Sequence, residues 1–216
     1  TNVDIFVKDL ASGELTLVSA DAGGVPGNGP STTPVFSPDG TKLMFASSAY
    51  NLLPGDSFDG AHHIYIKDLA TGAIERVVAG NSSSSVPVFS PDGTHIAFRS
   101  DATDLIPGDT NVNNDVFVMD LATGAVTRVS TDASGGEGID DSFNPGASSG
   151  VGVVFSPDGT KVAFDSLASN LVPGDTNFFV DVFVKDLSSG AITRVSTDAN
   201  GVQGNGPSYH IIFSPD

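Results

Sequence analysis

The chain has no cysteine and few basic residues, and both deficits limit what it can be. Without cysteine it has neither a disulfide framework nor a thiolate metal site, although its compartment stays open. Its 9 Lys and Arg residues stand against 26 Asp and Glu residues, for a net charge of −17. Affinity for nucleic acid comes from cations that neutralise phosphates, so we expect no nucleic-acid partner. Cations, basic partners or simple solvation are all compatible with an acidic surface.

Long apolar runs are also missing. No stretch approaches the roughly 18 residues that a membrane helix needs, so we expect no membrane insertion. What the chain has instead is 25 Gly and 13 Pro in 216 residues, which suits short strands joined by tight turns. This length is enough for a buried core and is typical of a single all-β domain. No signal peptide is visible, and the chain opens in mid-repeat, so we expect its true N-terminus to lie upstream.

Two short phrases recur through the chain. Phe-Ser-Pro-Asp-Gly begins at Phe36, Phe89 and Phe155, and its first four residues begin again at Phe213. A phrase resembling Asp-Val-Phe-Val-Lys-Asp-Leu begins at Asp4, His63, Asp115 and Asp181. Such a period indicates one supersecondary unit, copied and stacked. Catalysis needs one asymmetric set of residues, and copying a unit does not make one.

Each unit contains four short apolar runs, which in the third copy are residues 86–90, 95–100, 115–121 and 125–130. Ser90-Pro91-Asp92-Gly93 joins the first two, with Pro and Gly at positions that favour a type I turn. A turn ending on Gly124 joins the last two. The run from Val116 to Met119 is apolar on both faces, as expected for a sheet between two others. The pattern therefore predicts four-stranded antiparallel blades of a β-propeller.

The same residues carry a family resemblance. Pro87-Val-Phe-Ser-Pro-Asp-Gly-Thr-His-Ile-Ala-Phe98, followed by the run 115–121, resembles the WD40-like PD40 repeat of TolB-type propellers. The resemblance covers nearly the whole chain and implies the propeller fold, but it says little about function. The sequence departs from TolB in its longer Pro-Gly-Asp-Thr-Asn connections, and its 216 residues include no segment that resembles the TolB N-terminal domain.

We label the strands of a blade A to D from the propeller axis outward. The predicted single all-β domain, residues 1–216, then holds three whole blades and one split blade. The whole blades are residues 34–80, 86–133 and 152–199, and the split blade has strands C and D at 1–20 and strand A at 209–216. Such a chain is either a four-bladed ring closed by its termini or an excerpt of a larger propeller. We expect the excerpt, because the chain breaks off inside a turn motif and TolB-like rings usually have more blades.

The B–C and D–A loops of a blade emerge on one face of a propeller, opposite the short A–B and C–D turns. The B–C loops carry regularly spaced oxygen side chains, which are Asp56 and Asp59, then Asp109, Asn111, Asn113 and Asp115, then Asp175, Asn177 and Asp181. Calcium takes six to eight oxygen ligands, which a compact loop of this kind supplies. We therefore predict structural Ca²⁺ in these loops. The alternative is that the Asp and Asn residues only cap turns.

Two irregularities interrupt the repetition. The D–A loop at residues 130–150 is enlarged and carries Glu137, Asp140, Asp141 and Phe143, whereas the one at 80–85 is cut short. The segment Asn177-Phe178-Phe179-Val180 places an apolar pair in a polar loop. These phenylalanines are either tucked under a neighbouring loop, which we favour, or part of a contact patch.

Catalytic motifs are not evident. No serine lies in a Gly-x-Ser-x-Gly elbow. The paired Asp residues are copied from repeat to repeat, which favours a role in turns or in ion binding over acid–base chemistry. We therefore expect a non-catalytic binding or structural module, extracellular, on the cell surface or periplasmic. Its partner would be a protein or a surface, and a small-molecule substrate is not expected. One alternative is the accessory propeller of a larger prolyl-oligopeptidase-like or tricorn-like peptidase, and another is a TolB-like envelope component that binds a partner protein.

Overall fold

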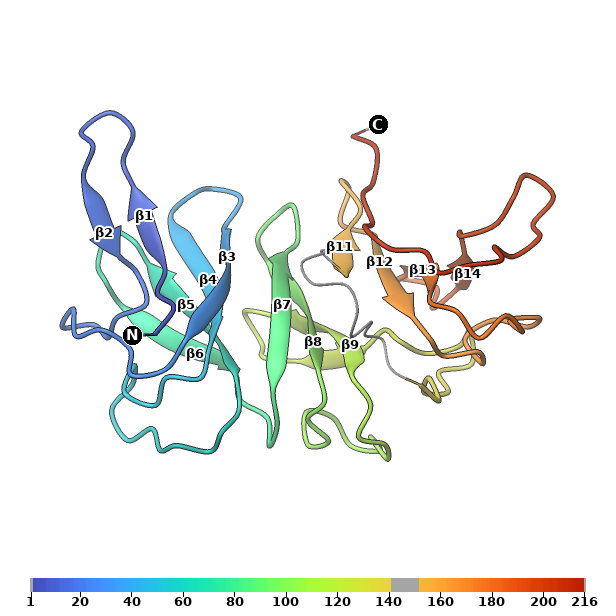
Figure 1. Ribbon diagram of the computed structural model, residues 1–216, viewed down its shortest axis with the longest axis horizontal. Helices are drawn as coiled ribbons and strands as arrows, with labels where there is room; N and C mark the ends of the chain where they lie inside the picture. The colour runs from blue at the N-terminus through green and yellow to red at the C-terminus, as the bar shows by residue number, and fades with distance from the viewer. Residues whose placement is uncertain (1, 141–151, 216) are drawn as a thin grey trace.

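The computed structural model describes residues 2–140 and 152–215, which form a row of antiparallel sheets (Figure 1). Within each sheet, every strand pairs with the strands next to it in the sequence. The two-stranded sheet is β1 (Phe6–Lys8) and β2 (Leu15–Leu17). The first four-stranded sheet is β3 (Ser31–Phe36), β4 (Lys42–Ser47), β5 (His63–Asp68) and β6 (Ile74–Val78). The second is β7 (Ser84–Phe89), β8 (His95–Ser100), β9 (Asp115–Asp120) and β10 (Val126–Arg128). The third is β11 (Val153–Phe155), β12 (Lys161–Ser166), β13 (Asp181–Asp186) and β14 (Ile192–Arg194).

The repeated Ser-Pro-Asp-Gly segment forms the same A–B turn in all three whole blades. In the first, the Gly40 amide donates to the Ser37 carbonyl at 2.8 Å, and Gly40 has a φ of +71° that glycine adopts without strain. The Ser37 hydroxyl donates to Asp39 at 2.6 Å, and Asp39 in turn accepts from the Thr41 amide. Local chemistry therefore closes each hairpin, as the sequence predicts.

Apolar contact between neighbouring sheets makes the core. In each whole blade an aromatic pair from strands B and C faces the preceding sheet: Phe45–Tyr65, Phe98–Phe117 and Phe164–Phe183, with ring centroids 5.7–5.9 Å apart. The first pair packs on Ile5 and Val18 of the β1–β2 hairpin. Offset stacks of this kind add to the apolar area that is already buried. The central strands are therefore buried on both faces, as their continuous apolar runs indicate.

A buried lysine reinforces two of these contacts. Lys67 in β5 donates from Nζ to the carbonyls of Ala20, at 2.6 Å, and Asp21, at 3.0 Å, in the loop of the preceding sheet. Lys185 in β13 makes the same contact with Thr131 and Asp132, each carbonyl at 2.9 Å. In the middle blade the equivalent residue is Met119, where the preceding loop is the short link 79–83. Among the three whole blades, a lysine is thus present at this position only where a long loop provides carbonyls.

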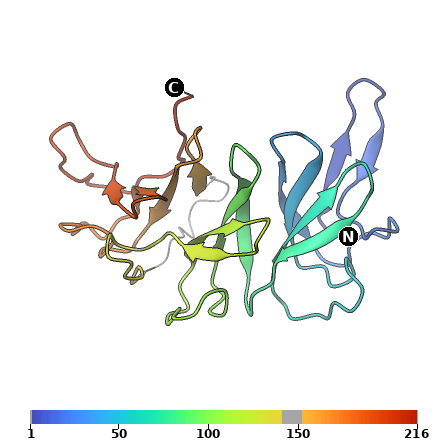
Figure 2. The same ribbon diagram turned by 180° about the vertical axis from the view of Figure 1, so that it is seen from behind.

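Short and long connections leave the sheets at opposite edges. The A–B turns lie along the upper edge in Figure 1, and the long loops β4–β5 and β8–β9 lie along the lower edge. The view from behind in Figure 2 shows the same separation. This confirms the arrangement expected for propeller blades. Among the described residues there is no helix, and hence none long and apolar enough to cross a membrane.

The predicted strand A at residues 209–216 needs a correction. Residues 209–215 form no strand, and residue 216 lies outside the described part. One backbone angle nevertheless matches two of the A strands: His210 has a φ of +62°, close to Thr33 at +51° and Val86 at +50°, which lie at the bulges of β3 and β7. The Ser208 amide also donates to the Val180 carbonyl at 2.8 Å. The segment thus shares one bulge angle with β3 and β7 but pairs with no described strand.

Candidate binding surface

The predicted ligands of the second B–C loop converge, but on an arginine. Arg128 Nη1 from β10 lies 3.1 Å from Asp109 Oδ1, 3.0 Å from Asp115 Oδ2 and 2.8 Å from Glu137 Oε2. Ser130 donates to Asp115 at 2.6 Å. Burial raises the pKa of Asp115, opposed by the Ser130 hydrogen bond and the Arg128 charge. The guanidinium thus joins the B–C loop to the enlarged D–A loop.

The third B–C loop repeats this arrangement. Arg194 Nη1 from β14 lies 3.1 Å from Asp175 Oδ1 and 3.5 Å from Asp181 Oδ2. Gln203 replaces Glu137 and accepts from the same nitrogen at 2.9 Å. The pKa of Asp175 is raised by burial and by the Asp181 charge beside it. Asn177 donates to Asp181 at 3.2 Å and to the Gly204 carbonyl at 3.0 Å, so it fastens this loop to its D–A neighbour.

The first B–C loop divides its acids between an arginine and a histidine. Asp56 lies 3.3 Å from Arg76 Nη1, and Tyr65 directs its hydroxyl to the same carboxyl group at 3.3 Å. Burial raises the pKa of Tyr65 to about 12. Asp59 lies 2.8 Å from Nε2 of His63. The Ala61 amide and the His63 ring hold the pKa of Asp59 below its usual range.

These contacts bear directly on whether the B–C loop acids are arranged to bind Ca²⁺. Within residues 2–140 and 152–215 no group of three or more His, Cys, Asp or Glu side chains is arranged to hold a metal ion. Asn111 accepts from the Asn113 amide at 2.8 Å, which is the turn-capping role that the sequence left as an alternative. Calcium in these loops stays a prediction, with an arginine already at the point where the carboxylates meet.

The sequence carried a signal for these arginines. Arg76, Arg128 and Arg194 occupy the same position of strand D, each followed by Val, and they are three of only 9 basic residues. A cation copied at one repeat position, in a chain so poor in cations, indicates a repeated acidic partner. The spacing of Asp and Asn within a single loop does not reveal this pairing.

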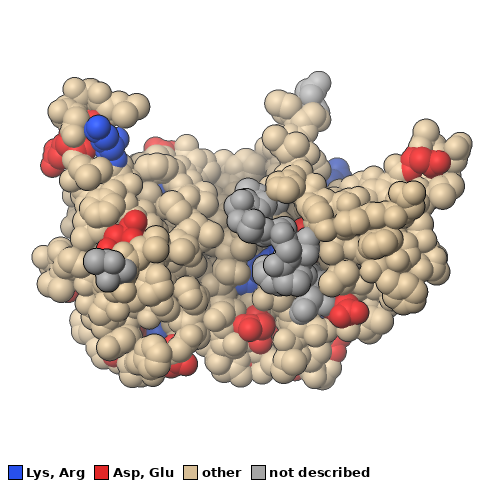
Figure 3. Space-filling model, viewed as in Figure 1, with Lys and Arg blue, Asp and Glu red and all other residues tan. Residues whose placement is uncertain are grey.

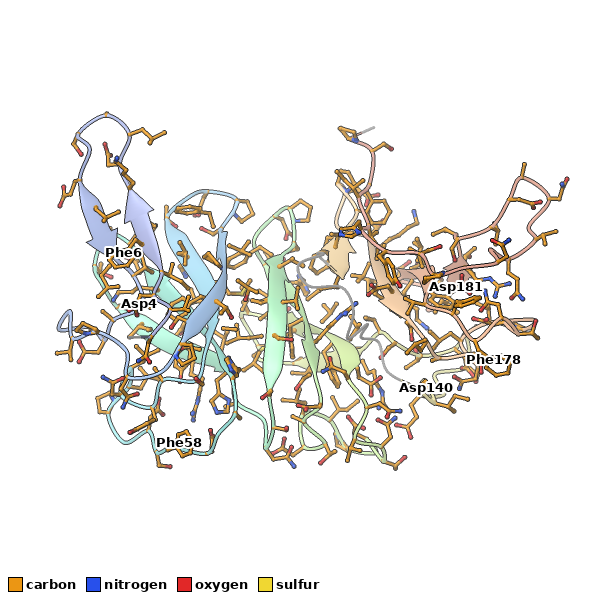
Figure 4. All side chains as sticks on the ribbon, in the orientation of Figure 1. Asp4, Phe6, Phe58, Asp140, Phe178 and Asp181 are labelled. Carbon is orange, nitrogen blue, oxygen red and sulfur yellow. The ribbon has the colours of Figure 1, made fainter. Side chains whose placement is uncertain are left out.

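The tips of the three B–C loops are apolar and exposed. Phe58 is 71% exposed, Val112 81% and Phe178 83%. The prediction that Phe178 and Phe179 are tucked under a neighbour is therefore wrong, since Phe179 is also 40% exposed. The bonds of Asn177 hold the loop base and leave these side chains outside. Tyr50 packs edge-on against Phe58 at 5.6 Å between ring centroids. Figure 4 shows Phe58 at the lower left and Phe178 at the lower right of the row.

The enlarged D–A loop borders the same surface. Its described part ends at Asp140, which is labelled in Figure 4, whereas Asp141 and Phe143 lie outside the described residues. Glu137 accepts from both the side chain and the backbone amide of Thr110 in the neighbouring B–C loop. In Figure 3 the acidic side chains form separate groups with few basic ones among them. The surface is apolar at the loop tips and acidic between them.

Sheets of this order and packing are blades of a β-propeller. A family model described as the TolB beta propeller domain matches residues 1–138, and the chain belongs to that family. The resemblance drawn from the repeated motif is thereby confirmed. The Tol-Pal system protein TolB of Francisella tularensis subsp. holarctica (strain OSU18) is 31% identical over 100 residues. That match covers 46% of this chain and 20% of the relative, so the chain corresponds to a minor part of such a protein.

Solved structures agree on the fold. TolB from Acinetobacter baumannii superposes with a TM-score of 0.55 at 22% identity, over 92% of this chain and 38% of that one. A structure described as putative TolB from Agrobacterium tumefaciens gives a TM-score of 0.53 at 20% identity, over 88% of this chain and 55% of that one. At these identities the similarity establishes the architecture alone.

Proposed function

We propose that this chain is a non-catalytic binding module that recognises a protein partner through the edge formed by its B–C and D–A loops. The observation that carries the proposal is the exposed apolar residue at the tip of each B–C loop, Phe58, Val112 and Phe178. Exposed apolar groups rimmed by polar ones are typical of interaction sites. Aromatic residues on a rigid support serve well as anchors of an interface.

The loops behind these tips support the same function. Each loop base is tied to its own blade by an arginine that contacts its acidic residues, so the tips are held in place before a partner arrives. A surface fixed in advance loses less conformational entropy on binding. The bonds of Arg128 to Asp109, Asp115 and Glu137 also make two loops act as one unit.

The relatives point to a class of partner and a compartment. They are named for the Tol-Pal system, and on that basis we propose an envelope protein as partner and a periplasmic or cell-surface location. Calcium bound by the same loops would serve only to stabilise them. A catalytic role is not part of the proposal, since the acids of the B–C loops are engaged with arginines and turn amides.

Affinity capture from the envelope fraction of the source organism tests the proposal. The bait is the intact chain, and the variant carries Phe58→Ser, Val112→Ser and Phe178→Ser together. We expect the captured protein to be lost with the variant. A matched control changes three exposed A–B turn residues, Thr41→Ser, Thr94→Ser and Thr160→Ser, and should retain it. Equal capture by all three baits would reject this surface.

A further inference from the structure

A cavity of about 290 Å³ lies between the first and second four-stranded sheets, at the edge of the A–B turns. We call it the inter-sheet cavity. Its apolar lining comes from strands and turns of both sheets and consists of Ile66, Val77, Phe89, Met119 and Leu121. Its charged lining consists of Asp39, Lys42, Glu75 and Asp92. An apolar lining with a few polar groups is typical of a binding site.

Two departures from the repeat coincide with this cavity. At the other two contacts between sheets, a long D–A loop reaches the next sheet, where Lys67 or Lys185 donates to its carbonyls. Between the first and second four-stranded sheets that loop is only the link 79–83, and Met119 takes the position of the lysine. Met119 therefore lines the cavity and makes no such bond to the preceding sheet. Both sheets are complete, and neither end of the chain takes part in the cavity.

A β-bulge shapes one wall of the inter-sheet cavity. The register of β5 and β6 shifts by one residue between Arg76 and Val78, so Val77 is an extra residue of β6 with no partner in β5. The pairing of β9 with β10 and of β13 with β14 shows no such shift. Bulges change the direction of side chains and are frequent beside functional sites. Here the bulge lies in the wall that Val77 and Glu75 supply.

The charged lining is mainly acidic. Three carboxylates, of Asp39, Glu75 and Asp92, stand against the ammonium group of Lys42. Hydrogen bonds from serines of the same turns lower the pKa values of Asp39 and Asp92 to about 2, so both are charged at neutral pH. Glu75 is exposed and forms no ion pair with any residue that the structure describes. The cavity therefore offers a net negative charge beside its apolar area.

We propose that the inter-sheet cavity binds a segment of a partner protein that carries a large aliphatic side chain beside a lysine or an arginine. The aliphatic side chain enters between Ile66, Met119 and Leu121, and the cation lies against Glu75. An apolar cavity of roughly 150 Å³ already holds benzene, so about 290 Å³ admits one or two side chains. Pockets for drug-sized ligands begin at about 300 Å³, which makes a side chain the better fit.

A different protein suits this cavity better than a second copy of the chain. Of the 9 basic residues, the arginines all contact carboxylates, and Lys67 and Lys185 are buried. Few lysines are left to provide the cation, and two chains that each carry a net charge of −17 repel each other. The cavity lies at the edge opposite the B–C loop tips (Figure 1), so this site goes beyond the proposed function.

Methionine NMR of the 216-residue chain tests the proposal. The chain has two methionines, Met119 in the cavity lining and Met44 in the buried core, so labelled methyl groups give a reporter and an internal control. The probe is the end-blocked peptide Gly-Arg-Leu-Arg-Gly, added up to about 5 mM, which detects dissociation constants near 1 mM. We expect the Met119 signal to shift and the Met44 signal to move much less. A Met119 signal that does not shift would overturn the proposal.

Two further peptides separate the apolar contact from the charge. Gly-Arg-Ala-Arg-Gly should bind about tenfold more weakly, because it lacks the side chain that is buried. Gly-Gln-Leu-Gln-Gly should bind about threefold more weakly or worse, because it lacks the cation that faces the carboxylates. Equal shifts of Met119 with all three peptides would reject the assigned occupant.

Two pairs of variants locate the site. Leu121→Lys places a cation in the cavity lining, and Leu187→Lys makes the same change in the equivalent turn of the third four-stranded sheet. Glu75→Lys reverses a charge of the lining, and Glu14→Lys does so in the β1–β2 turn. The first variant of each pair should weaken binding of Gly-Arg-Leu-Arg-Gly about tenfold, since like charges then meet. The second should leave it unchanged, and equal effects within both pairs would reject the cavity.

The remaining outcomes are also decisive. A preserved Met44 signal shows that a variant has kept the core. A Met119 signal that shifts with protein concentration alone, together with a rising mass in sedimentation velocity, would assign the cavity to a second copy and reject a partner protein. The loop-tip variant Phe58→Ser, Val112→Ser, Phe178→Ser should bind the peptide as the parent does, so this result is independent of the proposed function.

Discussion

Arg128 Nη1 lies 3.0 Å from Asp115 Oδ2, where the end of β10 meets the start of the neighbouring strand β9. Both side chains are buried, and Asp109 lies on the same guanidinium at 3.1 Å. The contact places a cation where oxygen ligands converge, and it decides how the B–C loop is held. Its equivalents Arg76 and Arg194 contact fewer acids, and Arg76 is also more exposed, so the two serve as internal controls.

Arg128→Met should destabilise the fold strongly. The variant leaves Asp109 and Asp115 buried without a cation, and breaking a buried pair in this way costs about 3–5 kcal/mol. Arg76 is more exposed and contacts Asp56 alone, so Arg76→Met should cost no more than about 1 kcal/mol. Urea unfolding at pH 7 measures both. Equal losses would show that the burial of the arginine and the number of acids it contacts are not what matters.

Calcium is tested by thermal unfolding. If the B–C loops bind Ca²⁺ structurally, millimolar calcium raises the melting temperature and a chelator lowers it, because a ligand that binds only the folded state stabilises it. Magnesium at the same concentration is the control, since it prefers a smaller octahedral site. Identical melting curves in calcium and chelator would reject calcium for this chain and leave the arginines as the stabilising cations.

The A–B turns should make the fold sensitive to acid. Hydrogen bonds from Ser37, Ser90 and Ser156 lower the pKa values of Asp39, Asp92 and Asp158 to about 2. A lowered pKa in the folded state adds stability that is complete above the unfolded value of about 3.9 and is lost as the pH falls toward 2. The triple variant Asp39→Asn, Asp92→Asn, Asp158→Asn should therefore be less stable than the parent at pH 7.

The comparison is made by urea unfolding at several pH values. The stability difference between the triple variant and the parent should shrink between pH 4 and pH 2, where the parent loses its advantage. Glu75→Gln, which removes an exposed carboxylate of β6, is the control. A difference that stays constant across this range would mean that the turns do not contribute through ionisation.

Lys67→Met should destabilise by about 1–3 kcal/mol, because it removes the bond to the buried Ala20 carbonyl and leaves the Asp21 carbonyl with the Gly24 amide. The exposed Lys42→Met should change stability by less than about 0.5 kcal/mol. The reverse change, Met119→Lys, should also destabilise, since the short loop before that blade offers no such carbonyls. An unchanged free energy of unfolding for Lys67→Met would show that the loop holds its shape without the lysine. Denaturant unfolding measures all three.

Much of this fold was predictable because its signals are local. A Ser-Pro-Asp-Gly turn closes through bonds within five residues, and strands apolar on both faces must lie between other sheets. The candidate surface was less predictable. Convergence of Asp109 and Asp115 was expected from spacing, but the arginine that meets them comes from the next strand. Exposure of Phe178 was not expected, because nothing in its loop showed which side chain the Asn177 bonds would leave outside.

The sequence by itself determined the architecture of this protein, since each copy of the unit carries its own turns and the apolar runs that pair within one blade. The tertiary structure alone decided what neutralises the acids and what joins the blades. Lys67 reaches carbonyls 46 and 47 residues earlier in the chain, and Arg128 joins two loops that folding brings together. A buried charge takes the nearest partner in space, and distance along the chain does not show which partner that is.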